Sequence, residues 1–188
     1  MESEDEAALV AGLRCGDAAA FDRVYELYRP RLFAFLLRLS RRRTVAEDLL
    51  DETWLRLVGH AASLRPDTRL AAWLFTVARN LYWTHRRSSL LEEAVTAELL
   101  TLWPSPFDLA STGELGRRVE KALATLPPQH REVLLLVGYE GLTPTEAAAV
   151  CRVTPEALRQ RLARARAALA DALDLPSAHL ALKRSYGT

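Results

Sequence analysis

The side chains best suited to chemistry lie between Arg152 and Arg166, where five arginines and Gln160 accompany a single acid, Glu156. These groups are hydrogen-bond donors, and nothing beside them resembles a nucleophile with its base or a set of metal ligands. Arg and Gln form bidentate hydrogen bonds with base edges, and Arg also neutralises phosphates. The stretch therefore predicts recognition of DNA.

Two helix starts position these donors. Thr143 and Thr154 are each followed by Pro, and a Thr side chain caps free amides while Pro suits the first helical position. Glu146 lies three residues after Thr143 and completes a capping box. A turn at residues 151–153 is so short that the two helices must cross steeply, which predicts a helix-turn-helix. Arg152 stands where Gly is common, and it is strained if its φ is positive.

The second helix has two different faces. An apolar stripe contains Leu158, Leu162, Ala165 and Leu169. The remaining surface carries long polar side chains separated by small ones, a pattern that suits base edges and phosphates in a major groove. The alternative is a solvated, Arg-rich helix in an ordinary bundle. The doubled Thr-Pro start favours the DNA-reading interpretation.

Composition limits the remaining possibilities. The chain has 188 residues, is 49% hydrophobic, and has no run of apolar residues long enough to cross a membrane. Its acidic start lacks the features of a secretory signal, so we predict a cytoplasmic protein with no membrane insertion. Cys15, Cys151 and four scattered His offer neither a disulfide framework nor metal-ligand spacing. Both thiols are predicted to be reduced and structural.

The net charge of +1 hides strong segregation of charge along the chain. Residues 1–10 carry four acids, residues 38–43 carry four Arg, and residues 88–116 carry five acids with no base. Such alternation is typical of a DNA-binding protein with selective partners.

The first half is predicted to be helical throughout. Asp17 caps a long helix, and Pro30 within it predicts a kink or a local break near Tyr28 and Arg29. Thr44 and Glu47 predict a capping box for a helix through Val58. The outward face of that helix mixes acids with exposed leucines, which suits a protein partner; its residues are Asp48, Leu49, Asp51, Glu52, Leu55 and Arg56.

A loop at residues 60–69 leads into a helix at residues 70–89 that is rich in aromatic residues. Trp73, Phe75, Tyr82 and Trp83 alternate there with Arg79, Asn80, Arg86 and Arg87. Aromatic side chains interleaved with Arg and Asn bind unstacked bases. The alternative is that the aromatic residues, Trp73 and Phe75 above all, form core and that the polar residues are simply solvated.

Four ordered segments resemble the extracytoplasmic-function sigma factors of bacterial RNA polymerase. They are AEDLLDETWLRL, LAAWLFTVARNLYWTHRRSS, LATLPPQHREVLLLVGYEGLTPTEAAAV and RQRLARARAAL. The match covers about residues 17–90 and 115–173. The resemblance implies a transcription initiation factor with no catalysis and no cofactor or metal. Its implied partners are core RNA polymerase, promoter DNA and a separate anti-sigma protein, and we expect a monomer when the chain is free.

The resemblance also implies a role for each segment. The helix matching residues 46–54 binds clamp helices of the largest polymerase subunit, through Asp48, Leu49, Asp51, Glu52 and Leu55. The loop and helix from Ser63 to Arg87 capture and open the minus-ten element, through Ser63, Leu64, Arg65, Asp67, Arg79, Asn80, Arg86 and Arg87. The helix-turn-helix reads the minus-thirty-five element, through Thr154, Pro155, Glu156, Arg159, Gln160, Arg161 and Arg164.

The predicted fold is all-α, with two small helical domains joined by a flexible linker. We place the domains at residues 1–90 and 114–175, the linker at 91–113 and a tail at 176–188. The five acids near the linker suggest a further hypothesis, in which they compete with DNA for the Arg-rich surfaces or mimic nucleic acid inside polymerase. The simpler alternative is that they only keep the segment soluble.

Two other functions are weighed against this interpretation. A stand-alone DNA-binding regulator would use the first half of the chain to sense a signal or to dimerise. Such a regulator would not need a helix with exposed acids and leucines together with a second helix in which aromatic residues and Arg are interleaved. An anti-sigma or adaptor decoy would bind polymerase without DNA, and Arg159, Gln160 and Arg164 argue against it.

Overall fold

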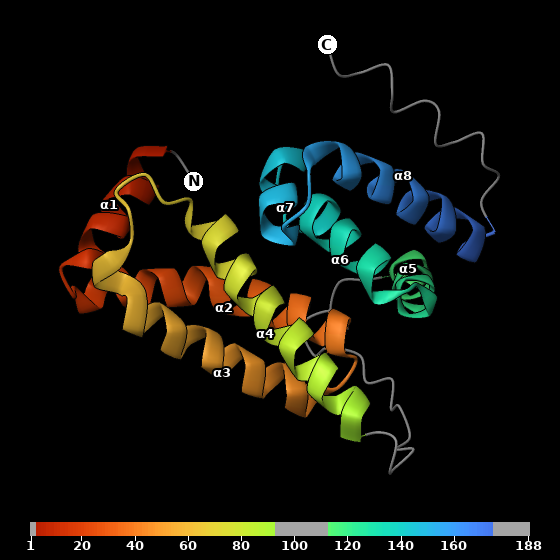
Figure 1. The fold of residues 1–188 in the computed structure, drawn as a ribbon, viewed down its shortest axis with the longest axis horizontal. Helices are drawn as coiled ribbons and strands as arrows, with labels where there is room; N and C mark the ends of the chain where they lie inside the picture. Colours follow the sequence, from red (N-terminus) through yellow and green to blue (C-terminus); the bar gives the residue numbers. More distant parts are fainter. Residues whose placement is uncertain (1–2, 93–112, 175–188) are drawn as a thin grey trace. The chain divides into compact units, whose positions relative to one another are not determined.

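A computed structural model describes residues 3–92 and 113–174, and every regular element within those ranges is helical (Figure 1). The chain divides into two compact units, one within residues 1–103 and the other within residues 104–188. The predicted all-α, two-domain fold is therefore confirmed. Residues 93–112 and 175–188, on which most of the linker prediction and the tail prediction fall, lie outside the described ranges.

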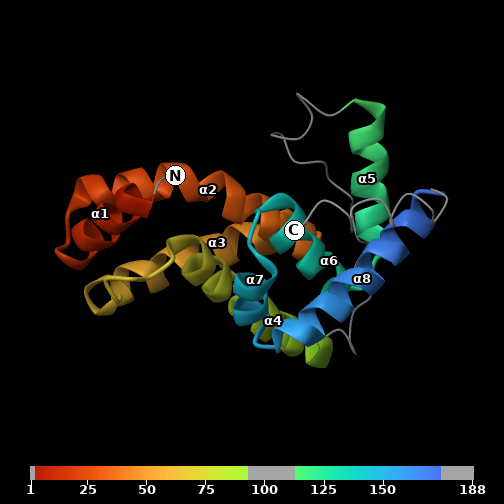
Figure 2. The ribbon, with the colours of Figure 1, turned by 90° about the horizontal axis from the view of Figure 1, so that it is seen from above.

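The first unit is a helical hairpin covered by two further helices (Figures 1 and 2). The hairpin helices α2 and α3 pack against each other, α4 packs against both, and α1 packs against α2. The elements are α1 (Ser3–Arg14), α2 (Ala18–Ser40), α3 (Arg43–His60), the 3-10 turn η1 (Ala61–Ser63) and α4 (Leu70–Glu92). The core is apolar, and Val24, Leu32, Leu57 and Leu74 are fully buried within it.

Two local predictions in this unit are wrong. Pro30 causes no local break, since helix α2 runs from Ala18 to Ser40 through it, with buried side chains on both sides of Pro30 in the core. The alternative prediction of a kink there stays a prediction. Helix α3 begins at Arg43, one residue before the predicted cap Thr44. Glu47 does not form a capping box, since its carboxylate lies 2.8 Å from Nε of Arg43. The predicted Asp17 cap of α2 is confirmed, because its Oδ1 accepts a hydrogen bond from the amide of Ala19.

The second unit packs α6 and α7 against α8. Its elements are α5 (Glu114–Thr125), α6 (Pro128–Leu134), a π-helical turn η2 (Leu135–Tyr139), α7 (Pro144–Cys151) and α8 (Pro155–Ala172). Arg131 holds the joint between α5 and α6. Its guanidinium is buried and donates to the carbonyls of Leu123, Ala124 and Leu126 at 2.9 to 3.0 Å, so it satisfies the end of α5.

The predicted helix-turn-helix is confirmed. Thr143 caps α7 in a full capping box with Glu146, and the Thr154 side chain accepts from the amide of Ala157 at the start of α8. Between the helices, Arg152 has a φ of 54° and a ψ of 46°, which is the left-handed conformation anticipated for this position. Its amide donates to the carbonyls of Ala148 and Ala149, so the strained residue also ends α7.

Candidate nucleic-acid and protein interfaces

Helix α8 presents the predicted polar face to solvent. Leu158, Leu162 and Ala165 are buried against the rest of the unit. The predicted contact residues on the other side are accessible: Thr154, Pro155, Glu156, Arg159, Gln160 and Arg164 are exposed, and Arg161 is half-buried. The apolar stripe therefore anchors the helix and leaves its long donors available to a ligand.

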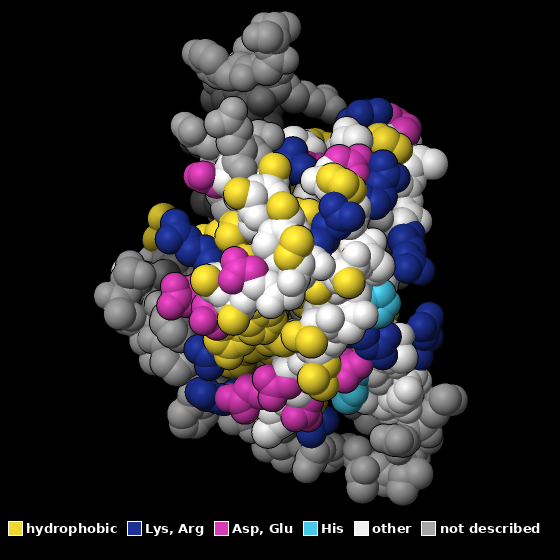
Figure 3. Space-filling view, turned by 90° about the vertical axis from the view of Figure 1, so that its left-hand side faces the viewer, with side chains coloured by type: hydrophobic (Ala, Val, Ile, Leu, Met, Phe, Trp, Pro, Cys, Tyr) yellow, Lys and Arg dark blue, Asp and Glu magenta, His cyan; other side chains and the backbone are white. Residues whose placement is uncertain are grey.

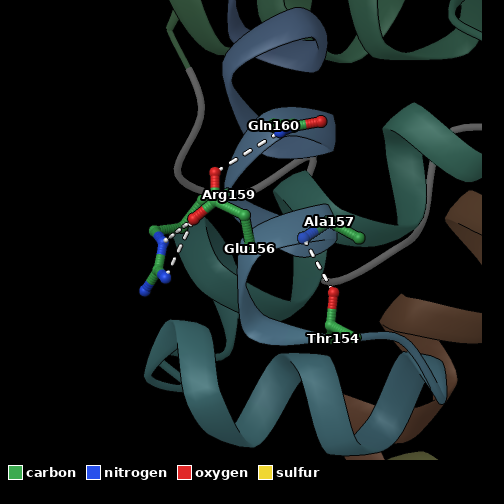
Figure 4. A network of polar contacts seen from close by, with 5 residues as sticks. All are labelled: Thr154, Glu156, Ala157, Arg159 and Gln160. Carbon is green, nitrogen blue, oxygen red and sulfur yellow. Dashed lines mark hydrogen bonds and ion pairs between the residues drawn. The ribbon is translucent and has the colours of Figure 1, made fainter.

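The donors of this face gather around one carboxylate (Figure 4). Glu156 lies 3.0 Å from Nη2 of Arg159 and accepts a second hydrogen bond from its Nε at 3.2 Å. The side-chain amide of Gln160 donates to the other oxygen of Glu156 at 3.4 Å. The structure thus brings together three of the predicted residues. DNA would have to compete with Glu156 for Arg159.

Helix α3 exposes hydrophobic and acidic side chains on one side. Leu55 is 66% exposed and Val58 is 61% exposed. Asp48 and Asp51 are exposed nearby on the helix, while Glu52 is half-buried and lies 2.7 Å from Nε of Arg56. Val58 was not predicted, although its position three residues after Leu55 places it on the same side.

Leu49 does not belong to this exposed side. It is only 8% exposed, so the prediction that it lies outward is wrong. The reason is that α3 packs against both α2 and α4, which widens its buried arc beyond a single stripe. Trp54 also faces inward, and its ring lies 4.8 Å from that of Tyr25 on α2.

The loop between α3 and α4 is held by short-range hydrogen bonds. The Ser63 hydroxyl donates to the carbonyl of His60 at 2.8 Å. Arg65 donates through Nε and Nη2 to the two oxygens of Asp67, each at 2.9 Å. These hydrogen bonds, together with the charge of Arg65, hold the pKa of Asp67 below its ordinary value of 3.8.

Leu64 was predicted to act on the minus-ten element with its polar neighbours, but it is only 5% exposed and belongs to the core. The η1 turn that precedes it packs against α1, which draws this apolar side chain inward. Ser63, Arg65 and Asp67 remain exposed around it. Leu64 therefore anchors the loop, and the neighbouring polar residues are the ones available to a ligand.

Helix α4 has a half-buried stripe beside its buried face. Leu70, Leu74, Phe75 and Ala78 are fully buried. The half-buried residues of α4 include Trp73, Thr76, Asn80 and Trp83, which share one side at helical spacing. Thr76 was not predicted, and Trp83 was predicted only as one of several aromatic residues. A helical wheel centred on Asn80 would have shown all four on one side.

The predicted cations of α4 flank this stripe. Nη1 of Arg79 lies 3.4 Å from Oδ1 of Asn80, and both residues are half-buried. The Arg86 guanidinium lies 6.0 Å from the ring centre of Trp83, within cation–π range. Arg87 is exposed and donates to the hydroxyl of Thr84 at 3.3 Å. Aromatic, amide and guanidinium groups thus alternate along about four turns.

Metal sites, membrane-spanning helices and paired cysteines are the remaining features to consider in the described ranges. Residues 3–92 and 113–174 contain no cluster of three or more metal-ligating side chains, and none of their helices is long and apolar enough to cross a membrane. Cys151 is buried, but Cys15 is exposed, so the prediction of two structural thiols is wrong for Cys15. On the face in Figure 3, acidic, basic and hydrophobic side chains are interspersed, and charge alone marks no binding surface there.

Comparison with known families assigns both units. The family described as Sigma-70 region 2 matches residues 24–89, and the family described as Sigma-70, region 4 matches residues 116–169. The first match covers most of α2 and all of α3 and η1, and it ends within α4. The second includes both helices of the helix-turn-helix up to Leu169.

Similar proteins agree with this assignment. The chain is 36% identical over 147 residues to the ECF RNA polymerase sigma factor EcfG of Rhodopseudomonas palustris, covering 77% of this chain and 80% of the relative. It is 33% identical over 151 residues to the RNA polymerase sigma factor CarQ of Myxococcus xanthus, covering 79% of this chain and 86% of that relative.

Two solved structures have a similar fold. The sigma factor RpoE of Bartonella quintana, in complex with the anti-sigma factor NepR, matches with a TM-score of 0.71 and 30% identity over 82% of this chain and 96% of that one. CnrH, in complex with the cytosolic domain of CnrY, matches with a TM-score of 0.67 and 25% identity over 90% of this chain and 97% of that one.

The two sigma-70 regions occur in order, one on each unit, and the relatives match over most of their own length. The chain therefore belongs to the extracytoplasmic-function group of the sigma-70 family and is a transcription initiation factor that binds core RNA polymerase and directs it to promoters.

Proposed function

We propose that the two units act in initiation through three separate binding surfaces. The outer side of α3 binds core polymerase, the loop at residues 61–69 with the half-buried stripe of α4 opens the minus-ten element, and the polar face of α8 reads the minus-thirty-five element. The observation that carries this proposal is the side of α3 on which Leu55 and Val58 lie exposed among acids. Exposed apolar side chains with a charged rim mark a protein interface.

The polymerase surface consists of Asp48, Asp51, Glu52, Leu55 and Val58. In such an interface the rim charges steer the encounter, and the buried apolar anchors set how long the complex lasts. Leu49 is left out because it is buried and supports the helix from within. The polymerase side is then expected to be basic at its rim and apolar at its centre.

The test is assembly with purified core polymerase. Replacing Asp51 and Glu52 together with Lys should abolish co-elution with core polymerase, since a cationic rim would repel a basic partner. A matched control replaces two exposed acids outside this surface, Asp22 and Glu26 of α2, with Lys. Circular dichroism should show that both variants stay folded. Wild-type affinity in the doubly reversed variant would remove α3 from the polymerase interface.

The DNA-opening surface is supported by the chemistry of its side chains. Flipping a base out of a duplex costs a few kcal/mol, which stacking and hydrogen bonds in a protein pocket must offset. Ser63, Arg65 and Asp67 are exposed in the loop, and Trp73, Asn80 and Trp83 are accessible along α4. Arg79, Arg86 and Arg87 are close enough in sequence to bind the flanking phosphates. The chain itself supplies binding and no bond-breaking chemistry.

Control by an anti-sigma protein is the second part of the proposal. The RpoE and CnrH structures are both complexes, the first with an anti-sigma factor and the second with the cytosolic domain of CnrY. A partner of this kind would act on the chain in the cytoplasm by covering surfaces that polymerase uses. Purification of the tagged chain from its host before and after stress should show an exchange between a small partner protein and core polymerase.

A further inference from the structure

Helix α1 is an integral part of the first unit, although it lies before the residues 24–89 that match sigma-70 region 2. Val10 and Leu13 of α1 are buried. A Cβ added at Gly12 would lie 2.5 Å from Cβ of Ala20 on α2, which is too close for two non-bonded carbon atoms. Glycine at this position therefore allows the close approach that fixes α1 on the unit.

The start of α4 is held by a residue of α1. Helix α4 has no acidic residue in its own first turn. Instead, Oε1 of Glu6 accepts a hydrogen bond from the amide of Leu70 at 2.9 Å, across 64 residues of sequence. The carboxylate satisfies an amide that would otherwise lack a partner inside the helix, and its charge opposes the positive end of the helix dipole.

The same carboxylate also holds the end of the loop. Oε2 of Glu6 lies 3.0 Å from Nε of Arg69, and the Glu6 side chain is only 12% exposed. Arg69 is the last loop residue, and its carbonyl accepts from the amide of Trp73 in the first turn of α4. One largely buried carboxylate thus contacts both the last loop residue and the first residue of the helix that carries Trp73 and Asn80.

We propose that Glu6 is a positioning residue for promoter opening, which acts from α1 by fixing the loop at residues 61–69 to the first turn of α4. The inference rests on the proposed function of that loop and helix. A pocket that must offset the unstacking of a base has to be preorganised, because ordering it at the moment of binding would consume part of the binding free energy. Glu6 provides that order without contacting DNA.

The experiment compares three substitutions with a matched control. Glu6→Ala removes both contacts, and Glu6→Gln keeps an oxygen that can accept from the amide of Leu70 but loses the charge. Arg69→Ala removes the ion pair and leaves the hydrogen bond from Leu70 to Glu6 in place. Asp5→Ala is the control, since Asp5 is an exposed acid on the same helix. Each variant is measured by amide hydrogen exchange in the free chain and by open-complex formation in holoenzyme, on duplex and premelted templates.

Glu6→Ala should accelerate exchange at residues 61–73 and leave residues 113–174 unchanged. It should slow opening of duplex DNA by about 2- to 30-fold, the range expected for loss of a helix cap. Glu6→Gln and Arg69→Ala should have smaller effects, Asp5→Ala none, and a premelted template should restore the rate. Polymerase binding should remain at the wild-type level in all four variants.

Different results would overturn different claims. Wild-type exchange at residues 61–73 in Glu6→Ala would show that Glu6 does not fix the loop. Faster exchange with unchanged opening of duplex DNA would show that Glu6 stabilises the loop but has no role in promoter opening. Substitutions at Arg65 and Asn80 separate these results from failure of the proposed function. If they leave opening unchanged, the proposed function is wrong, whereas if only Glu6→Ala leaves it unchanged, the positioning role is wrong.

Discussion

The carboxylate of Glu156 lies 3.0 Å from Nη2 of Arg159, so the free chain holds a candidate base-reading cation in an ion pair one helical turn away. Both side chains are more than half exposed, and solvent screens the pair. The ion pair is therefore weak enough to exchange for a phosphate or a guanine edge. DNA that binds Arg159 must first displace the carboxylate of Glu156.

Removing the charge of Glu156 should strengthen DNA binding. Glu156→Gln keeps the size of the side chain and releases Arg159, so we expect a gain of about 1.5- to 5-fold, which corresponds to a surface ion pair of about 0.2–1 kcal/mol. The gain should shrink as salt is raised, because salt screens the charges involved. Binding to labelled duplexes at several salt concentrations measures it. An unchanged affinity at low salt would show that the ion pair does not compete with DNA.

Sequence preference should depend on Arg159 and Gln160. Alanine at either position should reduce discrimination at one or two base pairs by about 1–3 kcal/mol each, because a base-edge contact is lost. Arg166→Ala is the matched control, since this exposed residue lies further along α8. It should weaken all sequences alike and lower the salt dependence of binding. Preference profiles that stay unchanged in both Arg159→Ala and Gln160→Ala would exclude this face from base reading.

Two leucines on α3 should behave in opposite ways. Leu55→Ala should leave stability within about 0.5 kcal/mol but weaken polymerase binding by about tenfold or more, as expected for an exposed interface anchor. Leu49→Ala should lower the free energy of unfolding by about 2–5 kcal/mol, because Leu49 is buried. Thermal unfolding and polymerase titration of each variant give the comparison. If Leu55→Ala loses stability without losing affinity, the exposed side of α3 is not the interface.

Asp67 should report the geometry of the loop through its pKa. Arg65 holds the pKa of Asp67 below 3.8 through hydrogen bonds and charge. The pair therefore stabilises the folded loop above that pH, and this stabilisation is lost as the pH falls through the lowered pKa and Asp67 becomes protonated. Arg65→Ala should raise the pKa of Asp67 toward its ordinary value, and Arg65→Lys should raise it less. Carboxyl-carbon NMR titration measures all three proteins, and equal values would show that the pair does not form in solution.

The close contact between Gly12 and Ala20 gives a test of how α1 is placed. Gly12→Ala should destabilise the first unit by about 1–3 kcal/mol, because the new methyl group cannot fit against Cβ of Ala20. Adding Ala20→Gly should restore most of that loss, since it reopens the space. Thermal unfolding and hydrogen exchange at residues 61–73 follow both effects. A stable Gly12→Ala protein with wild-type exchange would contradict this packing of α1.

Local signals explain which elements could be predicted from the sequence. The caps at Asp17, Thr143 and Thr154 involve residues two or three positions apart, so their patterns suffice. The same logic failed at Thr44, where Arg43 is a stronger partner for Glu47 than a backbone amide. Short patterns are reliable only where no charged neighbour competes.

Tertiary packing explains what the sequence could not predict. A helical wheel places Leu49 outward, and Leu64 lies in a loop, yet both are buried. Leu49 lies on α3, which packs against α2 and α4, and Leu64 directly follows η1, which packs against α1. The contact from Glu6 to Leu70 spans 64 residues and leaves no local pattern. The acidic start of the chain was visible in the sequence, but its link to α4 was not.

Transcription by core RNA polymerase, with and without the purified chain, tests the initiation function directly, on linear templates selected from genomic fragments by the reconstituted holoenzyme. Duplex promoters should be transcribed only when the chain is present. Variants at Arg65 and Asn80 should fail on duplex templates but work on premelted ones, while the Asp51 and Glu52 charge reversals should fail on both. Promoter binding by the chain without any gain in transcription would exclude a role in initiation and favour a stand-alone DNA-binding regulator.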